Sequence, residues 1–325
     1  MKSNLILLFS LIFFISCKND SEENVRVLAD SSGNINQVTV VMENSLWEGE
    51  VGEVVRDELA APVDGLPQEE PLFSLSQIPP QTFSGFVRKN RLFLLVEKGK
   101  QKDFQVIREE YAKPQTGVVV RGEDNEEIKE VVREHSDSII KILKITELRE
   151  KQRRIGKSLK NDEKLEEKLD VSLKFPSAYR YAMDEDDFIW IRKEIPKGLM
   201  EILVYEVPLS AIEKDTNVIG NIIKMRDSIG EKYIPGPVEG SYMQTEEAYA
   251  PYLFETEIDG HFAYETRGTW DVKNAFMAGP FVNYAVRDEE NNRYVILEGF
   301  LFYPSMSKRD NMFELDAILQ SAKIN

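Results

Sequence analysis

The sequence has little of the side chains that most often form metal and catalytic sites: one cysteine, Cys17, and two histidines, His135 and His261. A single cysteine excludes an intramolecular disulfide and a multi-cysteine metal site. The histidines lie far apart and in no ligand-spaced motif, whereas a zinc or catalytic histidine site needs several converging groups. Glycine-rich phosphate loops and nucleophile-elbow motifs are also missing. We therefore expect no metal, no cofactor and no catalytic residue, which argues against an enzyme without excluding one.

Basic residues are also few relative to acidic ones. The chain has 57 acidic and 41 basic side chains and a net charge of -16. An acidic surface repels the phosphate backbone of nucleic acids, so we expect no nucleic acid partner. Beyond residue 17 no apolar run approaches the length of about 20 residues that a membrane-spanning helix needs. The rest of the chain is therefore expected to be a globular body.

The chain begins with its one long apolar run. Lys2 precedes the run from Leu5 to Ile15, which is too short to span a membrane. A basic start, a short apolar core and a small residue before the cut are typical of a secretory signal peptide. Ser16 followed by Cys17 resembles a bacterial lipobox, in which the chain is cleaved before a cysteine that carries acyl chains. We predict a lipoprotein signal peptide at 1–16 and lipidation of Cys17, which anchors the protein to the outer membrane.

Residues 17–34 are polar and acidic, which predicts a flexible tether. Lys18 followed by Asp20 and further acids is similar to the signal with which Bacteroidota export lipoproteins to the cell surface. The same composition also fits a solvated tether, so the periplasmic and the cell-surface side of the membrane both remain open.

The pattern of strands and helices predicts an α+β protein with two lobes, 35–169 and 170–325, each a mainly antiparallel sheet with packed helices. Strand patterns occur at 37–43, 91–98, 103–109, 117–121, 171–175, 188–194, 200–207, 254–258, 261–267, 281–287 and 294–303. Between the lobes, 123–169 is charged and free of proline, which predicts one long helix or a helical hairpin with a break at Gly156 or at 161–162. Further helices are predicted at 45–60, at 217–229 with an end at Gly230, and at 310–323. Similarity between the two halves is too weak to indicate a duplication.

Residues 62–80 contain five prolines. Proline fixes φ and removes an amide donor, which excludes a helix or an interior strand. Two interpretations remain: an extended connection over the surface, or a preformed loop that docks a partner protein of the cell envelope. For the second interpretation, the candidate partner-binding residues are Pro62, Asp64, Pro67, Pro71, Phe73 and Pro79.

The resemblance to a known family is carried by LWEGEVG at 46–52, APVDGLPQEEPLF at 61–73 and FIWIR at 188–192. These segments resemble a family of Bacteroidota lipoproteins that is classed only as a domain of unknown function. The resemblance covers essentially the whole chain after the signal peptide. It implies a place in the cell envelope and brings no catalytic residues with it.

Two functional hypotheses follow. The first is a non-enzymatic envelope lipoprotein that binds a partner or assists an assembly. The second is an envelope hydrolase or glycan-binding protein that uses acids and aromatic residues of the second lobe, where aromatic side chains are frequent between 249 and 303. Those aromatic residues alternate along predicted strands, as the core of a sheet would also require. A cleft lined by both residue types would favour the second hypothesis.

Overall fold

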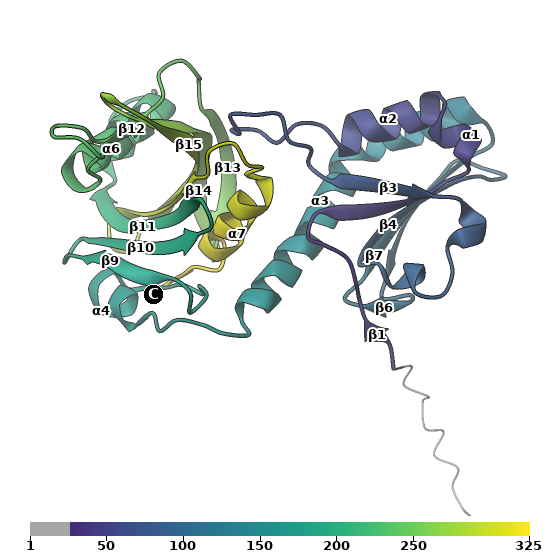
Figure 1. Cartoon of the computed structure of the whole chain (residues 1–325), viewed down its shortest axis with the longest axis horizontal. Coiled ribbons are helices and arrows are strands. Elements are labelled where there is room, and N and C mark those ends of the chain that lie inside the picture. Colours follow the sequence, from purple (N-terminus) through teal and green to yellow (C-terminus); the bar gives the residue numbers. More distant parts are fainter. Residues whose placement is uncertain (1–26) are drawn as a thin grey trace, which may run out of the picture.

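The structure, a computed structural model, describes residues 27–325. Two lobes are joined by one long helix, α3 (Asn125–Ile155) (Figure 1). Both lobes combine a β-sheet with packed helices, so the predicted α+β class is confirmed. The predicted signal peptide at 1–16 and the predicted lipidation site Cys17 lie outside the described residues.

The sheet of the first lobe has the strand order β3-β2-β4-β7-β5. Its strands are β2 (Gln37–Val41), β3 (Ser74–Ile78), β4 (Leu92–Lys98), β5 (Asp103–Arg108) and β7 (Thr116–Gly122). Strands β3, β2, β4 and β7 run parallel, and β5 is antiparallel to β7. This sheet therefore differs from the mainly antiparallel one that was expected. The helical segment between β2 and β3 explains the difference, because it returns the chain to the end of the sheet where β2 began.

Helices cover one face of this sheet. The short α1 (Asn44–Trp47) leads into α2 (Glu50–Leu59), and α2 and the first half of α3 pack valine, leucine and isoleucine side chains against the strands. Two short 3-10 helices, η1 (Pro80–Thr82) and η2 (Val87–Lys89), lie between β3 and β4. Strand β3 lies within the proline-rich segment and at the edge of the sheet. This position agrees with the prediction that the prolines exclude an interior strand.

The start of the described chain belongs to the first lobe. β1 (Ala29–Asp30) pairs in parallel with β6 (Ala112–Lys113), and the amide of Ser32 donates to a backbone carbonyl of the same lobe at 2.8 Å. The structure therefore differs from the flexible tether predicted over 17–34. Residues 29–34, the last part of the predicted tether, are held on the lobe by backbone hydrogen bonds. The composition of the segment does not indicate these bonds.

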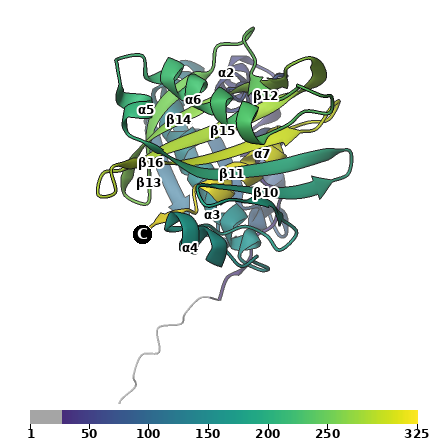
Figure 2. The same cartoon turned by 90° about the vertical axis from the view of Figure 1, so that its left-hand side faces the viewer.

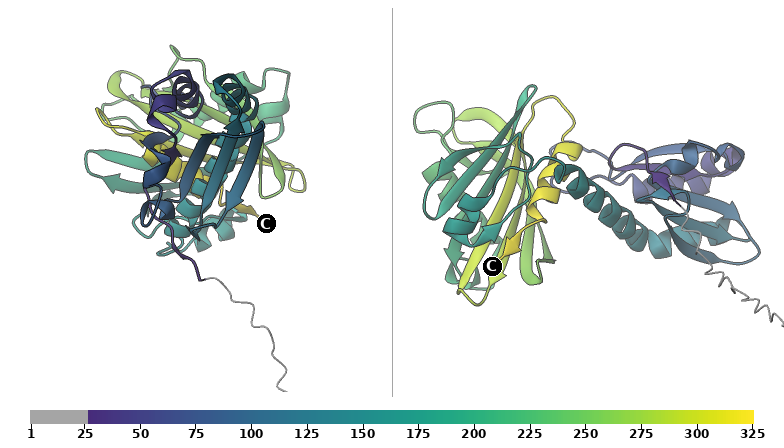
Figure 3. Two further views of the ribbon diagram at one scale, coloured as in Figure 1. Left: turned by 90° about the vertical axis from the view of Figure 1, so that its right-hand side faces the viewer. Right: turned by 90° about the horizontal axis from the view of Figure 1, so that it is seen from below.

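Helix α3 is bonded to both lobes. In the first lobe, Glu147 accepts a hydrogen bond from Arg91 Nε at 2.5 Å. One turn further along, Lys151 Nζ donates to Glu314 Oε2 of the second lobe at 2.8 Å. Figure 3 shows the helix running from the first lobe to the side of α7 (Arg309–Leu319), which is drawn in yellow. The helix is thus a continuous connection between the two cores.

The boundary between the lobes lies at Gly156, where α3 ends. This position is one of the two predicted breaks. The next helix, α4 (Glu163–Leu169), packs Leu165 and Leu169 into the core of the second lobe. Residues 157–169 therefore pack with the second lobe, although the sequence interpretation placed them in the first.

The second lobe is a curled antiparallel sheet in the order β12-β14-β15-β16-β11-β10-β9, with β13 also paired to β14 (Figure 1). Its strands are β9 (Arg180–Asp184), β10 (Phe188–Ile195), β11 (Gly198–Pro208), β12 (Met243–Thr245), β13 (Tyr252–Ile258), β14 (His261–Val272), β15 (Ala275–Asp288) and β16 (Arg293–Phe302). A separate short pair joins β8 (Val171–Ser172) to β17 (Lys323–Ile324). Alternating side chains along these strands build a core on each face.

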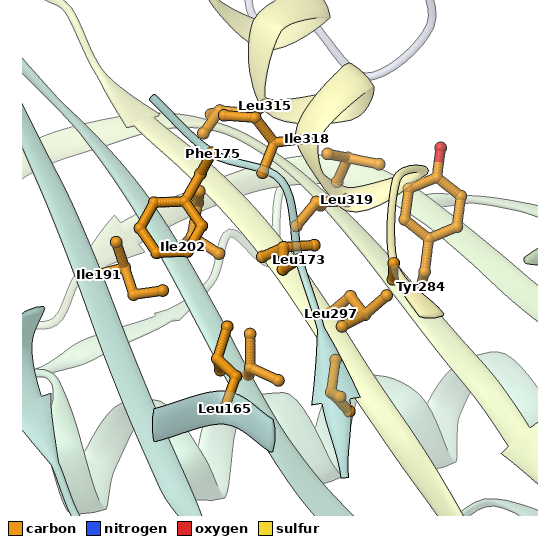
Figure 4. Packing of buried hydrophobic residues seen from close by; sticks show 14 of the residues in the cluster. Leu165, Leu173, Phe175, Ile191, Ile202, Tyr284, Leu297, Leu315, Ile318 and Leu319 are labelled. Carbon is orange, nitrogen blue, oxygen red and sulfur yellow. The ribbon is translucent and has the colours of Figure 1, made fainter. Parts of the chain in front are cut away.

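Different helices cover the two faces of this sheet. α5 (Ser210–Glu213) and α6 (Val218–Tyr233) lie on one face, and α7 lies on the other (Figure 2). In Figure 4, Leu315 and Leu319 of α7 point towards side chains of the sheet such as Leu297. Because α7 also contacts α3, it lies between the second sheet and the first lobe.

Candidate functional site

A cavity of about 620 Å³ lies where the two lobes meet. We call it the interlobe cleft. Its apolar lining consists of Val63, Leu72, Ile140, Ile145, Leu148, Phe254, Met312 and Phe313. Small-molecule sites usually have volumes of about 300–1,000 Å³ and mostly apolar walls with a few polar groups. Because α3, α7, β13 and the segment after α2 all contribute, the cleft depends on the contact between the lobes.

One wall of the interlobe cleft carries charges that satisfy one another. Arg267 Nη2 donates to Asp316 Oδ2 at 2.8 Å, and Arg267 Nε donates to Glu265. Gln320 Nε2 donates to Asp316 Oδ1 at 2.8 Å, and the Tyr284 hydroxyl donates to the same oxygen. Burial opposes ionisation of Asp316, but Arg267 and these donors hold the pKa of Asp316 below its ordinary value. The charged groups of this wall therefore already have partners.

Lys144 of α3 has no such carboxylate partner. No acidic side chain within residues 27–325 forms an ion pair with it. Its Nζ donates to the carbonyl of Leu72 at 3.1 Å and, over a longer distance of 3.4 Å, to Asn36 Oδ1. The ammonium also faces the rings of Phe73 and Phe313, at 4.8 and 5.2 Å from their centroids. Aromatic faces attract a cation, but they do not neutralise it.

The surroundings of Lys144 disfavour its charge. Burial, and then the positive charge of Arg309, lower the pKa of Lys144 to about 8. At neutral pH the side chain is therefore still mostly an ammonium, in a place where an ammonium is poorly solvated. An anion beside it would reduce this penalty, since an opposite charge stabilises the ionised form.

The segment between α2 and β3, residues 60–73, connects the lobes beside the cleft (Figure 1). Its Glu70 accepts hydrogen bonds from the backbone amides of Lys308 and Arg309, at 2.6 and 3.0 Å. These amides begin α7, where a negative charge is stabilised by the helix dipole. Gly65 has φ of +80°, and a Cβ there would lie 2.8 Å from Cβ of Arg267. Glycine is therefore needed for the close approach of this segment to the second lobe.

The predicted partner-binding residues fall into three groups. Exposed positions on the connecting segment are occupied by Pro62, Asp64, Pro67 and Pro71, and of these Asp64 lines the interlobe cleft. Pro79 is half-buried at the start of η1. Phe73 is fully buried in the core of the first lobe, so it does not face a partner. The segment does dock, but within the described chain its contacts are with the second lobe.

The sequence interpretation did not identify Lys144, Arg267 or Arg309. Lys144 stands in a helix with many charged residues, and only the approach of α7 and of the connecting segment distinguishes it from the others. Arg267 lies on β14, in a stretch where buried and half-buried residues alternate. The available signal was weak: Lys144 directly follows the buried Leu143 on the apolar side of the predicted helix.

A second, smaller cavity of about 240 Å³ lies within the second lobe. It is lined by Trp190, Trp270 and Phe300 together with Glu201 and Arg192. The carboxylate of Glu201 accepts from Trp190 Nε1 at 2.7 Å and from Arg192 Nε at 2.8 Å. Burial nevertheless raises the pKa of Glu201 to about 7. The indole N–H of Trp270 is buried and has no hydrogen-bond partner. This cavity combines an acid with aromatic rings, as the second functional hypothesis requires.

Neither a cluster of metal-ligating side chains nor a membrane-spanning helix is found within residues 27–325. In that part of the chain, no group of three or more histidine, cysteine, aspartate or glutamate side chains is arranged to hold a metal ion. No helix of the same part is both long enough and apolar enough to cross a membrane.

Comparison with protein families gives two matches. Residues 158–321 match the model described as Domain of unknown function (DUF4837), and residues 31–156 match Domain of unknown function (DUF8532). The two matches meet at the end of α3, where the structure separates the lobes. The predicted resemblance to a domain of unknown function is thereby confirmed in that coarse form.

Among solved structures, the chain is similar to "Crystal structure of LpqN involved in cell envelope biogenesis of Mycobacterium tuberculosis". That similarity has a TM-score of 0.29 and 12% sequence identity, and it covers 48% of this chain and 83% of LpqN. No curated protein matches the sequence. Since the first family model matches just over half of its length, the chain belongs to the family described as Domain of unknown function (DUF4837).

Proposed function

We propose that this protein is a non-enzymatic binding module of the cell envelope and that its ligand occupies the interlobe cleft. The observation that carries the proposal is Lys144, a partly buried ammonium that forms no ion pair within residues 27–325 and lies beside an apolar cavity of about 620 Å³. A buried charge normally has a partner, because desolvation is costly. A bound ligand would supply that partner.

The place in the envelope rests on the first residues of the chain. The signal-peptide pattern at 1–16 and the lipobox-like Ser16 and Cys17 support a lipid anchor in the outer membrane. Two or more acyl chains on Cys17 would hold the protein stably on a membrane, since each buried methylene contributes about 0.8 kcal/mol. Because 29–34 pack on the first lobe, only the residues between Cys17 and Ala29 would separate the anchor from the folded body.

The lining of the interlobe cleft supports binding more than catalysis. It contains no serine, threonine, cysteine or histidine among the described residues. Two of its three carboxylates, Glu265 and Asp316, are engaged with Arg267. Neither is therefore free to act as the general base that would activate a nucleophile.

The proposal is tested by photocrosslinking in intact cells. A photoreactive benzoylphenylalanine replaces Ile145, which lines the cleft and is 37% exposed. The matched control places the same residue at Val238, which is 50% exposed and outside the cleft. After irradiation, mass spectrometry should find a discrete added mass on the peptide containing position 145 and none on the peptide containing position 238. Absence of an adduct at 145, or equal adducts at both positions, would contradict the proposal.

The second hypothesis, a glycan-binding role, is favoured by one observation: the cavity of about 240 Å³ that combines Glu201 with two tryptophans. Trp190 and Trp270 are two of the three tryptophans of the chain, so binding there should change the intrinsic fluorescence. A Trp47→Phe background leaves only these two as emitters. Titration of that variant with a panel of methyl glycosides tests the hypothesis, and an unchanged spectrum throughout would argue against it.

A further inference from the structure

We infer that the ligand of the interlobe cleft is an amphiphile with a single apolar tail and a carboxylate, and that the carboxylate binds the ammonium of Lys144. This inference rests on the proposed function and specifies the chemistry of its ligand. It is carried by the shape of the apolar walls, by the distribution of charge in the cleft and by the unused hydrogen-bonding capacity of one lysine.

The apolar walls suit a hydrocarbon tail. Ile140, Ile145 and Leu148 belong to α3, and Met312 and Phe313 belong to α7, so the two helices supply walls from different lobes. Ile145 is 37% exposed although it is a large apolar side chain. Phe254 of β13 also lines the cleft and is 40% exposed. An apolar tail between these residues would remove their apolar surface from water, which favours binding.

The charge of the cleft favours an anion. Its lining contains four cationic and three acidic side chains, in a protein whose net charge is -16. Arg267 pairs with both Glu265 and Asp316, so that wall carries one cation against two carboxylates and has no cation left for a ligand. The remaining side chains are Asp64 against Lys141, Lys144 and Arg309. The lining as a whole therefore has a net formal charge of +1. Arg309 pairs with Asp310, and Lys141 is exposed, so Lys144 is the partly buried cation that has no ion pair within residues 27–325.

The hydrogen bonds of Lys144 are incomplete. An ammonium has three N–H donors. The carbonyl of Leu72 accepts one at 3.1 Å, and Asn36 accepts a second only at the longer distance of 3.4 Å. A third donor has no acceptor within the described chain. A ligand carboxylate would accept this bond and provide the missing negative charge in one group.

Other ligand charges fit less well. A cationic amphiphile would bring a positive charge next to Lys144 and Arg309, which like charges disfavour. A neutral amphiphile would bury the walls but leave the ammonium without a counter-charge, now further from water. One partly buried ammonium matches one negative charge, so a monoanionic carboxylate is preferred to a phosphate dianion.

The experiment compares three probes that share one tail: dodecanoate, dodecanol and dodecyltrimethylammonium. Each is titrated into the full-length protein, held in lipid nanodiscs, and binding is followed by isothermal titration calorimetry with empty nanodiscs as the blank. We expect dodecanoate to bind about ten- to a hundredfold more tightly than dodecanol, as a charge-assisted hydrogen bond implies. Dodecyltrimethylammonium should bind most weakly of the three.

Variants assign the effect to one side chain. Lys144→Met keeps an unbranched stem and removes the charge, so it should lower the affinity for dodecanoate about ten- to a hundredfold and leave the affinity for dodecanol unchanged or higher. Retained dodecanol binding also shows that the cleft of the variant is intact. Lys157→Met, at an exposed lysine outside the cleft, is the matched control and should change dodecanoate binding less than about threefold.

The wild-type protein provides a test without substitution. Dodecanoate binding should weaken as the pH rises between about 7 and 10, because the free Lys144 loses its proton near pH 8, and dodecanol binding should not change. The other charged groups that face Lys144 are Glu147 on its own helix, Arg309 and Asp316 of α7, and Arg267 of β14. Asp316 has a lowered pKa, and the arginines keep their charge in this range, so none of these three explains such a change.

The outcomes separate the two claims. If none of the probes binds, the inference is overturned, and the crosslink at position 145 decides separately whether the proposed function stands. If dodecanol binds as tightly as dodecanoate, with no effect of Lys144→Met or of pH, the cleft binds apolar molecules and the inference alone is overturned. The inference is also overturned if an apolar peptide with a free C-terminal carboxylate binds at least as tightly as dodecanoate, since the ligand would then be a peptide.

Discussion

The substitution Glu201→Gln should make this protein increasingly stable relative to the wild type as the pH rises. Glu201 is 2% exposed on β11, and its carboxylate accepts hydrogen bonds from Trp190 and Arg192. These interactions favour the ionised form, but burial outweighs them and raises the pKa to about 7. Glutamine keeps the shape of the side chain and cannot ionise, so it isolates the effect of the charge.

The magnitude follows from the difference between the folded and unfolded states. The ordinary pKa is 4.5 and the folded pKa is about 7, and one pH unit corresponds to about 1.4 kcal/mol, so the linkage amounts to about 3 kcal/mol. Between these two pKa values the folded state keeps a proton that the unfolded state has lost. Stability from this group is therefore fully present below about pH 4.5 and is lost as the pH rises through about 7.

The assay is urea unfolding of the wild type and of Glu201→Gln at several pH values from about 5 to 8. The unfolding free energy of Glu201→Gln minus that of the wild type should increase by about 2 to 3 kcal/mol from the lowest to the highest pH of this range. A constant offset between the two proteins is also expected, because the glutamine amide meets Arg192 and Trp190 differently at every pH. Only the slope of the difference tests the reasoning.

The control is Glu206→Gln on the same strand, where the side chain is exposed. It corrects for the loss of one negative charge from an acidic protein. A difference between wild type and Glu201→Gln that stays constant with pH, or that shifts towards the wild type as the pH rises, would refute the claim that burial holds a proton on this carboxyl.

Three further predictions concern the lobe contact, the core and the anchor. Glu70→Gln should weaken the cap of α7 by about 1 kcal/mol and speed hydrogen exchange in 61–73, whereas the exposed neighbour Glu69→Gln should not; equal exchange in both variants would contradict this. Leu297→Ala, in the fully buried core beneath α7, should lower the unfolding free energy by about 2–5 kcal/mol in urea, and a loss under about 1 kcal/mol would show that this core is loosely packed. Cys17→Ser should leave an unlipidated precursor, which intact-protein mass and membrane fractionation measure; a normal mature mass with normal membrane recovery would reject the anchor.

Most strands could be predicted because their burial follows a local pattern. The runs now seen as β4, β5, β10 and β16 were predicted within two residues at each end. The end of α3 could also be predicted, since Gly156 interrupts a charged helical sequence. Patterns of this kind depend on neighbouring residues alone.

Other features depended on contacts between distant residues. α6 was predicted to end at Gly230 but continues to Tyr233. The reason for the glycine is a close approach to β12, because a Cβ at this position would lie 2.0 Å from the carbonyl oxygen of Met243. The strand direction in the first sheet was likewise missed, since it depends on which strands become neighbours and not on their composition.

The interlobe cleft lay beyond sequence reasoning for a related reason. Two of its four cations, Lys144 and Arg309, are among 41 basic residues, and neither stands in a motif. What sets Lys144 apart is burial by elements far away in the chain. The proline-rich segment was interpreted as an extended connection or as a loop that docks a partner protein, and the sequence could not show that its Glu70 binds the start of α7 in the same chain.

The continuity of α3 also constrains how the chain can tolerate insertions. Each residue of an α-helix turns the following part by about 100°. One residue inserted between Glu147, which bonds to the first lobe, and Lys151, which bonds to the second, would rotate the second lobe by that angle about the helix axis. Glu70 would then no longer meet α7, and the cleft would lose one of its walls. The number of residues between these two contacts therefore fixes how far the second lobe is rotated about the helix axis relative to the first. The cleft forms only at that rotation.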